Sequence, residues 1–109
     1  MTINDVNKCY DYCADYLDKL NHNQINALYK YFTMKFKDCK MLSKGMGRVA
    51  CLHVLVWLKT QAKDEDTVEN YSIWQKLTDV WTFMLGMLMA QDEYNKYNPN
   101  YKSRIWLTK

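Results

Sequence analysis

The most apolar part of this sequence reads RVACLHVLVWLKTQ and occupies residues 48–61. Its apolar side chains fall on every side of a helical projection, so a helix formed here has no polar face for water. A helix that is apolar all round is buried, and we therefore expect a central helix. The β-branched residues around Val54 and Val56 also suit a strand. A lone strand would have no partner, because no second strand candidate of similar length occurs in the chain.

Helical periodicity also marks the rest of the chain. Apolar side chains recur every three or four residues in 4–20, in 24–41, and in a fourth segment that starts at Thr67 or Ser72 and ends near residue 94. This spacing places them along one stripe of an α-helix. Gly86 lies inside the fourth segment, where glycine is unfavourable, and it predicts a close helix crossing.

Short joints separate these segments. Asn4 and Asn23 are the expected N-caps of the first two helices. Gly45 and Gly47 permit the turn before the third, and Pro99 ends the fourth. The sequence therefore predicts an all-α fold, a compact bundle of about four helices with a docked C-terminal tail.

Composition and length agree with one globular unit. A chain of 109 residues buries enough surface to fold around a single core, so we expect one helical domain over residues 1–109. Hydrophobic residues make up 49% of the chain and charged residues 25%, which excludes a disordered or fibrous protein. Three Gly and one Pro supply too few turn residues for a β-sandwich or barrel.

The sequence also predicts a compartment and a source. The N-terminal residues form no signal peptide, and the longest apolar runs are shorter than the roughly 20 residues that span a bilayer. We expect a cytoplasmic protein with no membrane partner, in which the cysteines are free thiols. The abundance of Lys, Asn and Tyr indicates an AT-rich coding sequence, such as that of a phage or mobile element.

The four cysteines and one histidine admit two interpretations. Cys9, Cys13 and Cys39 lie on inward stripes, and Cys51 and His53 lie in the apolar third segment. Zinc takes about four thiolate or imidazole ligands, which this set can supply in number. The short C-x-x-C spacing typical of zinc sites does not occur, however, and free cysteine packs as a small hydrophobe. We expect core packing and neither a metal nor another cofactor, with the metal site as the alternative.

Motifs that carry catalysis do not occur in this sequence. It contains no G-x-S-x-G elbow, no phosphate-binding glycine loop and no H-E-x-x-H motif. His53 lacks a neighbouring nucleophile or acid in the sequence pattern. We therefore predict that the protein is not an enzyme and has no small-molecule substrate.

Residues 30–48 carry six basic side chains and one acidic one, and they suggest a nucleic-acid interface. The basic residues are Lys30, Lys35, Lys37, Lys40, Lys44 and Arg48. A helix-turn-helix would need an exposed recognition helix after the turn, whereas residues 48–61 are the most apolar in the chain. Non-specific binding through phosphate contacts remains the alternative function.

Surplus apolar surface favours a protein partner instead. Four Trp, nine Tyr, seven Met and three Phe exceed the needs of one small core, and aromatic residues and Met are enriched at interfaces. The apolar arc of the fourth segment is wider than one packing neighbour needs. In the second segment, Met34 and Met41 are seven residues apart and share the outer face with lysines.

We therefore predict a non-enzymatic regulator or inhibitor that binds another protein through an apolar and basic helical surface. The partner would be a second copy, giving a dimer, or a host protein. The residues assigned to this surface are Lys30, Met34, Lys37, Met41, Trp74 and Leu85.

Overall fold

The computed structural model describes residues 1–40, 42 and 47–97, and it confirms the predicted all-α bundle over these residues. The helices are α1 (Ile3–Leu17), α2 (His22–Lys35), α3 (Arg48–Thr60) and α4 (Val68–Tyr97). No strand occurs in the described ranges. The tail that we expected to dock on the bundle lies outside them.

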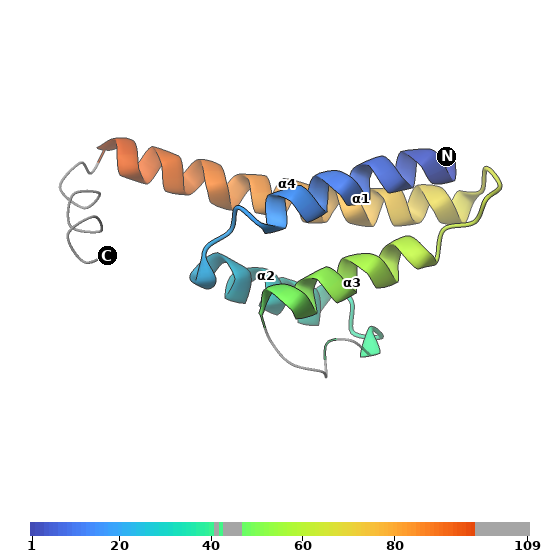
Figure 1. The fold of residues 1–109 in the computed structure, drawn as a ribbon, viewed down its shortest axis with the longest axis horizontal. Coiled ribbons are helices and arrows are strands. Elements are labelled where there is room, and N and C mark those ends of the chain that lie inside the picture. Colours follow the sequence, from blue (N-terminus) through green and yellow to red (C-terminus); the bar gives the residue numbers. More distant parts are fainter. Residues whose placement is uncertain (41, 43–46, 98–109) are drawn as a thin grey trace.

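Figure 1 shows α1 lying along the first half of α4, with both helices running in the same direction. Tyr16, near the end of α1, packs against Trp81 of α4 with ring centroids 5.8 Å apart. α3 runs in the opposite direction beside them, and α2 crosses the bundle obliquely (Figure 1). With 30 residues, α4 is about 45 Å long, and its C-terminal part projects past the other helices.

One stripe of each helix forms the core. The helical side chains that cluster in the buried hydrophobic core are Val6, Cys9, Cys13 and Leu17 from α1, Ile25, Leu28 and Phe32 from α2, Cys51, Val54, Leu55 and Leu58 from α3, and Ile73, Leu77, Val80 and Met84 from α4. In α1, α2 and α4 these positions match the stripes predicted from three- and four-residue spacing. Burying each large apolar side chain contributes roughly 1.5–3 kcal/mol.

The N-caps of the first two helices lie two residues earlier than the caps predicted from sequence. Thr2 caps α1 and Asn21 caps α2. Each forms a capping box, with Asp5 and Gln24 respectively, in which the cap side chain and the third helical side chain each accept from the other's backbone N–H. Such a box satisfies two backbone donors instead of one, which explains why these residues are chosen over Asn4 and Asn23.

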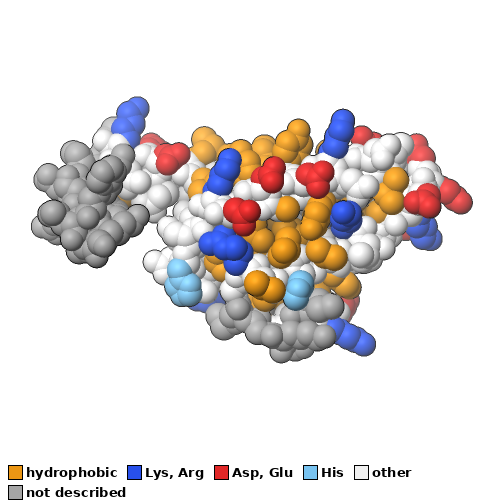
Figure 2. All heavy atoms as spheres, viewed as in Figure 1, with side chains coloured by type: hydrophobic (Ala, Val, Ile, Leu, Met, Phe, Trp, Pro, Cys, Tyr) orange, Lys and Arg blue, Asp and Glu red, His pale blue; other side chains and the backbone are white. Residues whose placement is uncertain are grey.

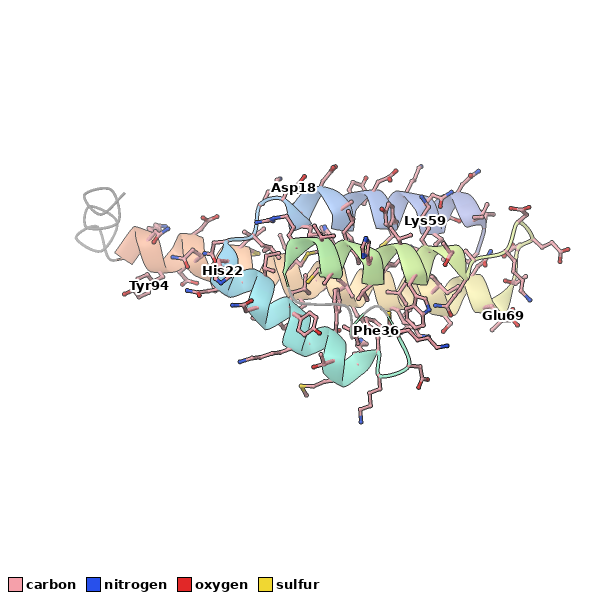
Figure 3. All side chains as sticks on the ribbon, turned by 60° about the horizontal axis from the view of Figure 1, so that its bottom comes forward. Asp18, His22, Phe36, Lys59, Glu69 and Tyr94 are labelled. Atoms are coloured by element: carbon pink, nitrogen blue, oxygen red, sulfur yellow. The ribbon has the colours of Figure 1, made fainter. Side chains whose placement is uncertain are left out.

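The second helix is shorter than predicted, because it ends at Lys35 instead of continuing to Met41. Phe36 leaves the helical conformation with φ −120° and ψ 58°. Its ring is buried and lies 6.4 Å from that of Trp57 on α3. Figure 3 labels Phe36 at the end of α2. Met34 and Met41 therefore do not share one helix, and Met41 lies outside the described residues.

The third helix begins at Arg48 as predicted, but it is not buried on all sides. Val49 is 65% exposed, Val56 is 37% exposed and His53 is also exposed. The expectation of a fully buried central helix is therefore wrong. In a bundle of four helices no helix is enclosed by the others, so α3 keeps an outer face whatever its composition.

The fourth helix begins at the first of the two predicted starts. The Thr67 hydroxyl accepts a hydrogen bond from the main-chain N–H of Asn70 at 3.1 Å. Thr67 therefore acts as the N-cap, and Ser72 lies inside the helix. Among the described residues, no helix makes the close crossing predicted at Gly86, because a Cβ atom there would have no neighbour within 4 Å.

Candidate functional site

A first groove lies between α2 and α4, and we call it the α2–α4 groove. It has a volume of about 550 Å³ and is lined by Ala27, Lys30, Tyr31, Met34, Lys35 and Phe83. Tyr31 and Phe83 join the two helices at its floor, with ring centroids 4.5 Å apart. Met34 stands at its edge and is 75% exposed. The groove thus combines an apolar surface with flexible methionine, which suits an adaptable interface.

Two lysines give the rim of the α2–α4 groove its charge. Lys30 is exposed, and Lys35 forms an ion pair with Asp79 of α4 at 2.8 Å. Partial burial lowers the pKa of Lys35, but hydrogen bonds to Asp79 and the Tyr31 hydroxyl outweigh it and raise the pKa above its usual value. Lys35 therefore stays protonated and holds α2 against α4, while Lys30 offers its charge to solvent.

A second groove lies between α1 and α4, and we call it the aromatic groove. It has a volume of about 630 Å³ and is lined by Asp5, Lys8, Cys9, Tyr12, Tyr16, Trp74, Thr78 and Trp81. Trp74, Thr78 and Trp81 are three and four residues apart and share one side of α4. The four aromatic rings make its surface apolar, and both charged residues belong to the N-terminal half of α1.

Two thiols meet beside the aromatic groove. Cys9 Sγ lies 3.5 Å from Thr78 Oγ1, and Cys13 Sγ donates to the carbonyl of Leu77 at 3.3 Å. The interaction with the neighbouring Cys13 side chain is the main reason that the pKa of Cys9 falls to about 7, while burial opposes the shift and Thr78 assists it. The same contact and deep burial raise the pKa of Cys13 far above its usual value. Cys9 is thus the ionisable thiol of the pair.

The structure divides the six residues that we assigned to one partner surface. Lys30 and Met34 line the α2–α4 groove, whereas Trp74 lines the aromatic groove. Lys37 is exposed in the turn after α2, and Leu85 is half-buried on α4. Met41 lies outside the described residues, so the predicted surface is two separate surfaces.

Sequence reasoning missed the α4 side chain that completes the α2–α4 groove. Phe83 is two residues after Trp81, and at about 100° per residue it faces the opposite side of α4. The over-wide apolar arc predicted for this helix indicated more than one packing neighbour, but it did not include Phe83. The aromatic groove was missed because Tyr12 and Tyr16 were not included in the inward stripe of α1.

The residues of the alternative nucleic-acid face are not all presented to solvent. Lys30 and Lys37 are exposed, while Lys35 is paired with Asp79. Arg48 is half-buried and donates from its guanidinium to the main-chain carbonyls of Leu17 and Leu20. Lys40 is exposed and makes interactions of its own, and Lys44 lies outside the described residues. The face available for phosphate contacts is smaller than the sequence suggested.

Charge divides the described surface by helix. Asp5, Asp11, Asp15 and Asp18 of α1 and its C-cap are exposed, and Figure 2 shows acidic side chains in red along this helix. Below them, hydrophobic side chains in orange gather between α1 and α3 (Figure 2). In α2, by contrast, the exposed charged side chains are the basic residues Lys30 and Lys35, and the helix contains no Asp or Glu. A charged partner would therefore distinguish α1 from α2.

The cysteines and histidines do not gather into a metal centre. Cys9, Cys13, Cys39 and Cys51 are buried free thiols, and His22 and His53 are exposed. Among the described residues, no group of three or more His, Cys, Asp or Glu side chains is arranged to hold a metal ion.

Across residues 1–40, 42 and 47–97, no helix has both the length and the apolar character needed to cross a bilayer. Comparison of the chain with protein-family models, curated proteins and solved structures found no match.

Proposed function

We propose that this protein is a non-enzymatic binding module that takes an amphipathic helix of a partner protein into the α2–α4 groove. The observation that carries the proposal is the pairing of an apolar floor with a basic rim. Phe83 and the exposed Met34 supply the apolar contact, and Lys30 supplies an open positive charge. A helix with an apolar stripe flanked by Asp or Glu complements both features.

The lining of the groove suits a helical occupant. An amphipathic helix inserts apolar anchors at positions i, i+3, i+4 and i+7 into a shallow apolar groove. The α2–α4 groove is bounded on both sides by helices, and its methionine adapts to anchors of different shape. Because Lys35 is held by Asp79, specificity for acidic flanks rests on Lys30. A regulator or inhibitor acting by such masking needs no catalytic group.

A synthetic peptide provides a defined probe of this proposal. The peptide is an amphipathic helix of about 18 residues with Leu anchors and Glu flanks, and its counterpart carries Lys flanks. Fluorescence anisotropy should show binding of the Glu peptide and at least about tenfold weaker binding of the Lys peptide. Met34→Asp should lower the affinity for the Glu peptide by about thirtyfold, because losing an interface hot spot costs about 2 kcal/mol of binding free energy.

Matched variants separate the groove from general surface effects. Met89 is an exposed methionine on α4 outside the groove, so Met89→Asp should leave peptide affinity unchanged. Lys30→Glu should reverse the preference and favour the Lys peptide. Equal effects of Met34→Asp and Met89→Asp, or binding without regard to flank charge, would refute the proposal.

Two other occupants are distinguishable outcomes. The protein could instead bind a labelled oligonucleotide, with an affinity that falls steeply as salt is added and falls again in Lys30→Glu. That result would support the alternative function, nucleic-acid binding. Self-association in sedimentation experiments, abolished by Met34→Asp, would replace the partner helix by a second copy. Capture from host lysate after nuclease treatment, compared between Met34→Asp and Met89→Asp, then identifies the natural partner.

A further inference from the structure

We propose that the outer face of α1 and α3 binds an amphipathic helix of a partner protein that carries Lys or Arg along its flank. We call this surface the α1–α3 face and define it by Tyr10 and Ala14 of α1 and by Val49, Leu52 and Val56 of α3. None of these residues lines the α2–α4 groove. The inference therefore adds a second docking surface, which is independent of the proposed function.

The α3 side of this face is an exposed apolar stripe. Val49, Leu52 and Val56 are three and four residues apart, the spacing by which one helix packs along another. Val49 is 65% exposed, Val56 is 37% exposed and Leu52 is half-buried. Valine forms helices less readily than lysine or glutamate, so helix formation alone gives no reason for valines at these exposed positions. A stripe of this kind suits contact with a further helix.

The helix α1 supplies the other side of the face. Tyr10 and Ala14 are one helical turn apart, and together with Val49 and Leu52 they border a hollow of about 350 Å³. α1 and α3 lie side by side and run in opposite directions (Figure 1), and Figure 2 shows hydrophobic side chains gathered between them. A helix lying along this line would contact both α1 and α3, as a further helix does when it joins a bundle.

Three exposed carboxylates determine which kind of helix suits the face. Asp11, Asp15 and Asp18 recur at four and three residues, so they form a row along α1 beside Ala14. Asp15 and Asp18 also border the hollow. A helix whose apolar stripe is flanked by Lys or Arg complements both the apolar surface and this row, whereas a helix with Glu flanks would be repelled by the row.

The basic side chains beside the face are engaged within the protein. Arg48 donates to main-chain carbonyls at the end of α1, and Lys59 Nζ lies 4.3 Å from the centroid of the Tyr10 ring. Both basic side chains are half-buried, and they offset only part of the negative charge of the exposed Asp row. We therefore expect the basic helix to bind more weakly than the Glu peptide binds the α2–α4 groove, which agrees with the preference of at least about tenfold predicted above.

The Lys peptide defined above is the probe, and the full chain is titrated against it by fluorescence anisotropy. We expect saturable binding that weakens as salt is added. Val49→Asn with Val56→Asn should lower the affinity for the Lys peptide by at least about tenfold, because the apolar contact is lost. Val68→Asn is the matched control, since Val68 is 82% exposed at the start of α4 and outside the face. It should leave the affinity unchanged.

Asp11→Lys with Asp15→Lys tests the acidic row. Reversing both charges should lower the affinity for the Lys peptide by at least about tenfold and remove most of its salt dependence. Asp64→Lys with Glu65→Lys makes the same change of net charge in the exposed connection between α3 and α4, so it is the matched control. An equal effect of the two double variants would show that only the net charge matters, and it would overturn the proposal.

The two peptides together separate this inference from the proposed function. Val49→Asn with Val56→Asn should leave the affinity for the Glu peptide unchanged, whereas Met34→Asp should lower the affinity for the Glu peptide alone. Either surface can therefore fail its test while the other passes. An unchanged affinity for the Lys peptide in the valine double variant would overturn the proposal. Self-association that this variant abolishes would also overturn it, because the occupant would then be a second copy.

Discussion

The guanidinium of Arg48 reaches across the bundle to the end of α1, where Nη2 donates to the main-chain carbonyl of Leu20 at 2.7 Å. Nη1 donates to the carbonyl of Leu17. Carbonyls at the end of a helix lack intrahelical donors, and the helix dipole favours a cation there. Arg48, at the start of α3, thus supplies hydrogen-bond donors to main-chain carbonyls at the C-terminal end of α1.

Replacing Arg48 should destabilise the fold. Arg48→Met leaves the half-buried carbonyls of Leu17 and Leu20 without their charged donor, and we expect a loss of about 1.5–3 kcal/mol in the free energy of unfolding. Arg48→Lys should retain only part of this stability, because an ammonium group lacks the planar guanidinium that reaches both carbonyls. Urea titration measures both. Lys37→Met removes an exposed charge and should change stability by less than about 0.5 kcal/mol, and a similar loss there would contradict the assignment.

Asn70 performs a comparable role at the other end of the bundle. It is fully buried, accepts from the Lys63 amide at 2.8 Å and donates to the carbonyls of Lys63, Glu65 and Met1. Asn70→Ala would leave these groups unpaired, and we expect a loss of about 2–4 kcal/mol in the free energy of unfolding. Thermal or urea unfolding measures it.

Ser72→Ala, on an exposed site of the same helix, is the matched control for Asn70→Ala. We expect it to change stability by less than about 0.5 kcal/mol. If Asn70→Ala also fell within that range, the hydrogen bonds of Asn70 would not be holding the α3–α4 connection.

Sequence periodicity predicted the helices because burial and spacing are local properties of each stripe. The buried side chains of α1 and α4, such as Cys13 and Leu77, lie at the positions that the three- and four-residue repeats predict. The end of α2 was not predictable in this way. Phe36 leaves the helix to reach Trp57 on α3, and only the packing of the two helices reveals that this contact stabilises the turn.

The grooves were harder to predict, because each needs the relative orientation of two helices. Lys30 and Met34 were identified from their exposure on one helix, but their partner Phe83 is distant in sequence. Arg48 looked like a phosphate ligand because its charge is visible in the sequence, whereas the carbonyls that it binds become available only where α1 ends.

Substituting alanine at two glycines, Gly47 and Gly86, should change the stability of the protein in opposite directions. Gly47 precedes α3 with φ 111° and ψ −174°, a region that is essentially restricted to glycine, so Gly47→Ala should cost about 1–3 kcal/mol. Gly86 is helical and exposed, and a Cβ there meets nothing within 4 Å. Gly86→Ala should therefore add about 0.5–1 kcal/mol of stability. Circular dichroism melts of both variants measure the difference, and a destabilised Gly86→Ala would indicate a packing contact at that site.

Cys51 should make the protein sensitive to alkali. Burial raises its pKa to about 11 in the folded state, against a partial opposing effect of Arg48, while the unfolded thiol has its usual value of 9.0. A raised folded pKa means that the contribution to stability is complete below pH 9.0 and is lost as the pH rises through about 11, because the unfolded state ionises first.

Between about pH 8 and about pH 10.5, wild type should lose about 2 kcal/mol more stability than Cys51→Ala, in which this thiol is absent. Urea unfolding at the two pH values measures the difference. The opposite shift of Cys9 is common to both proteins and cancels. Leu55→Ala removes a non-ionising side chain from the same buried face of α3, so its cost should be the same at both pH values. If the cost of Cys51→Ala were equally independent of pH, the thiol would be ionising as readily in the folded protein as in the unfolded chain, and water would have to reach it beneath α3.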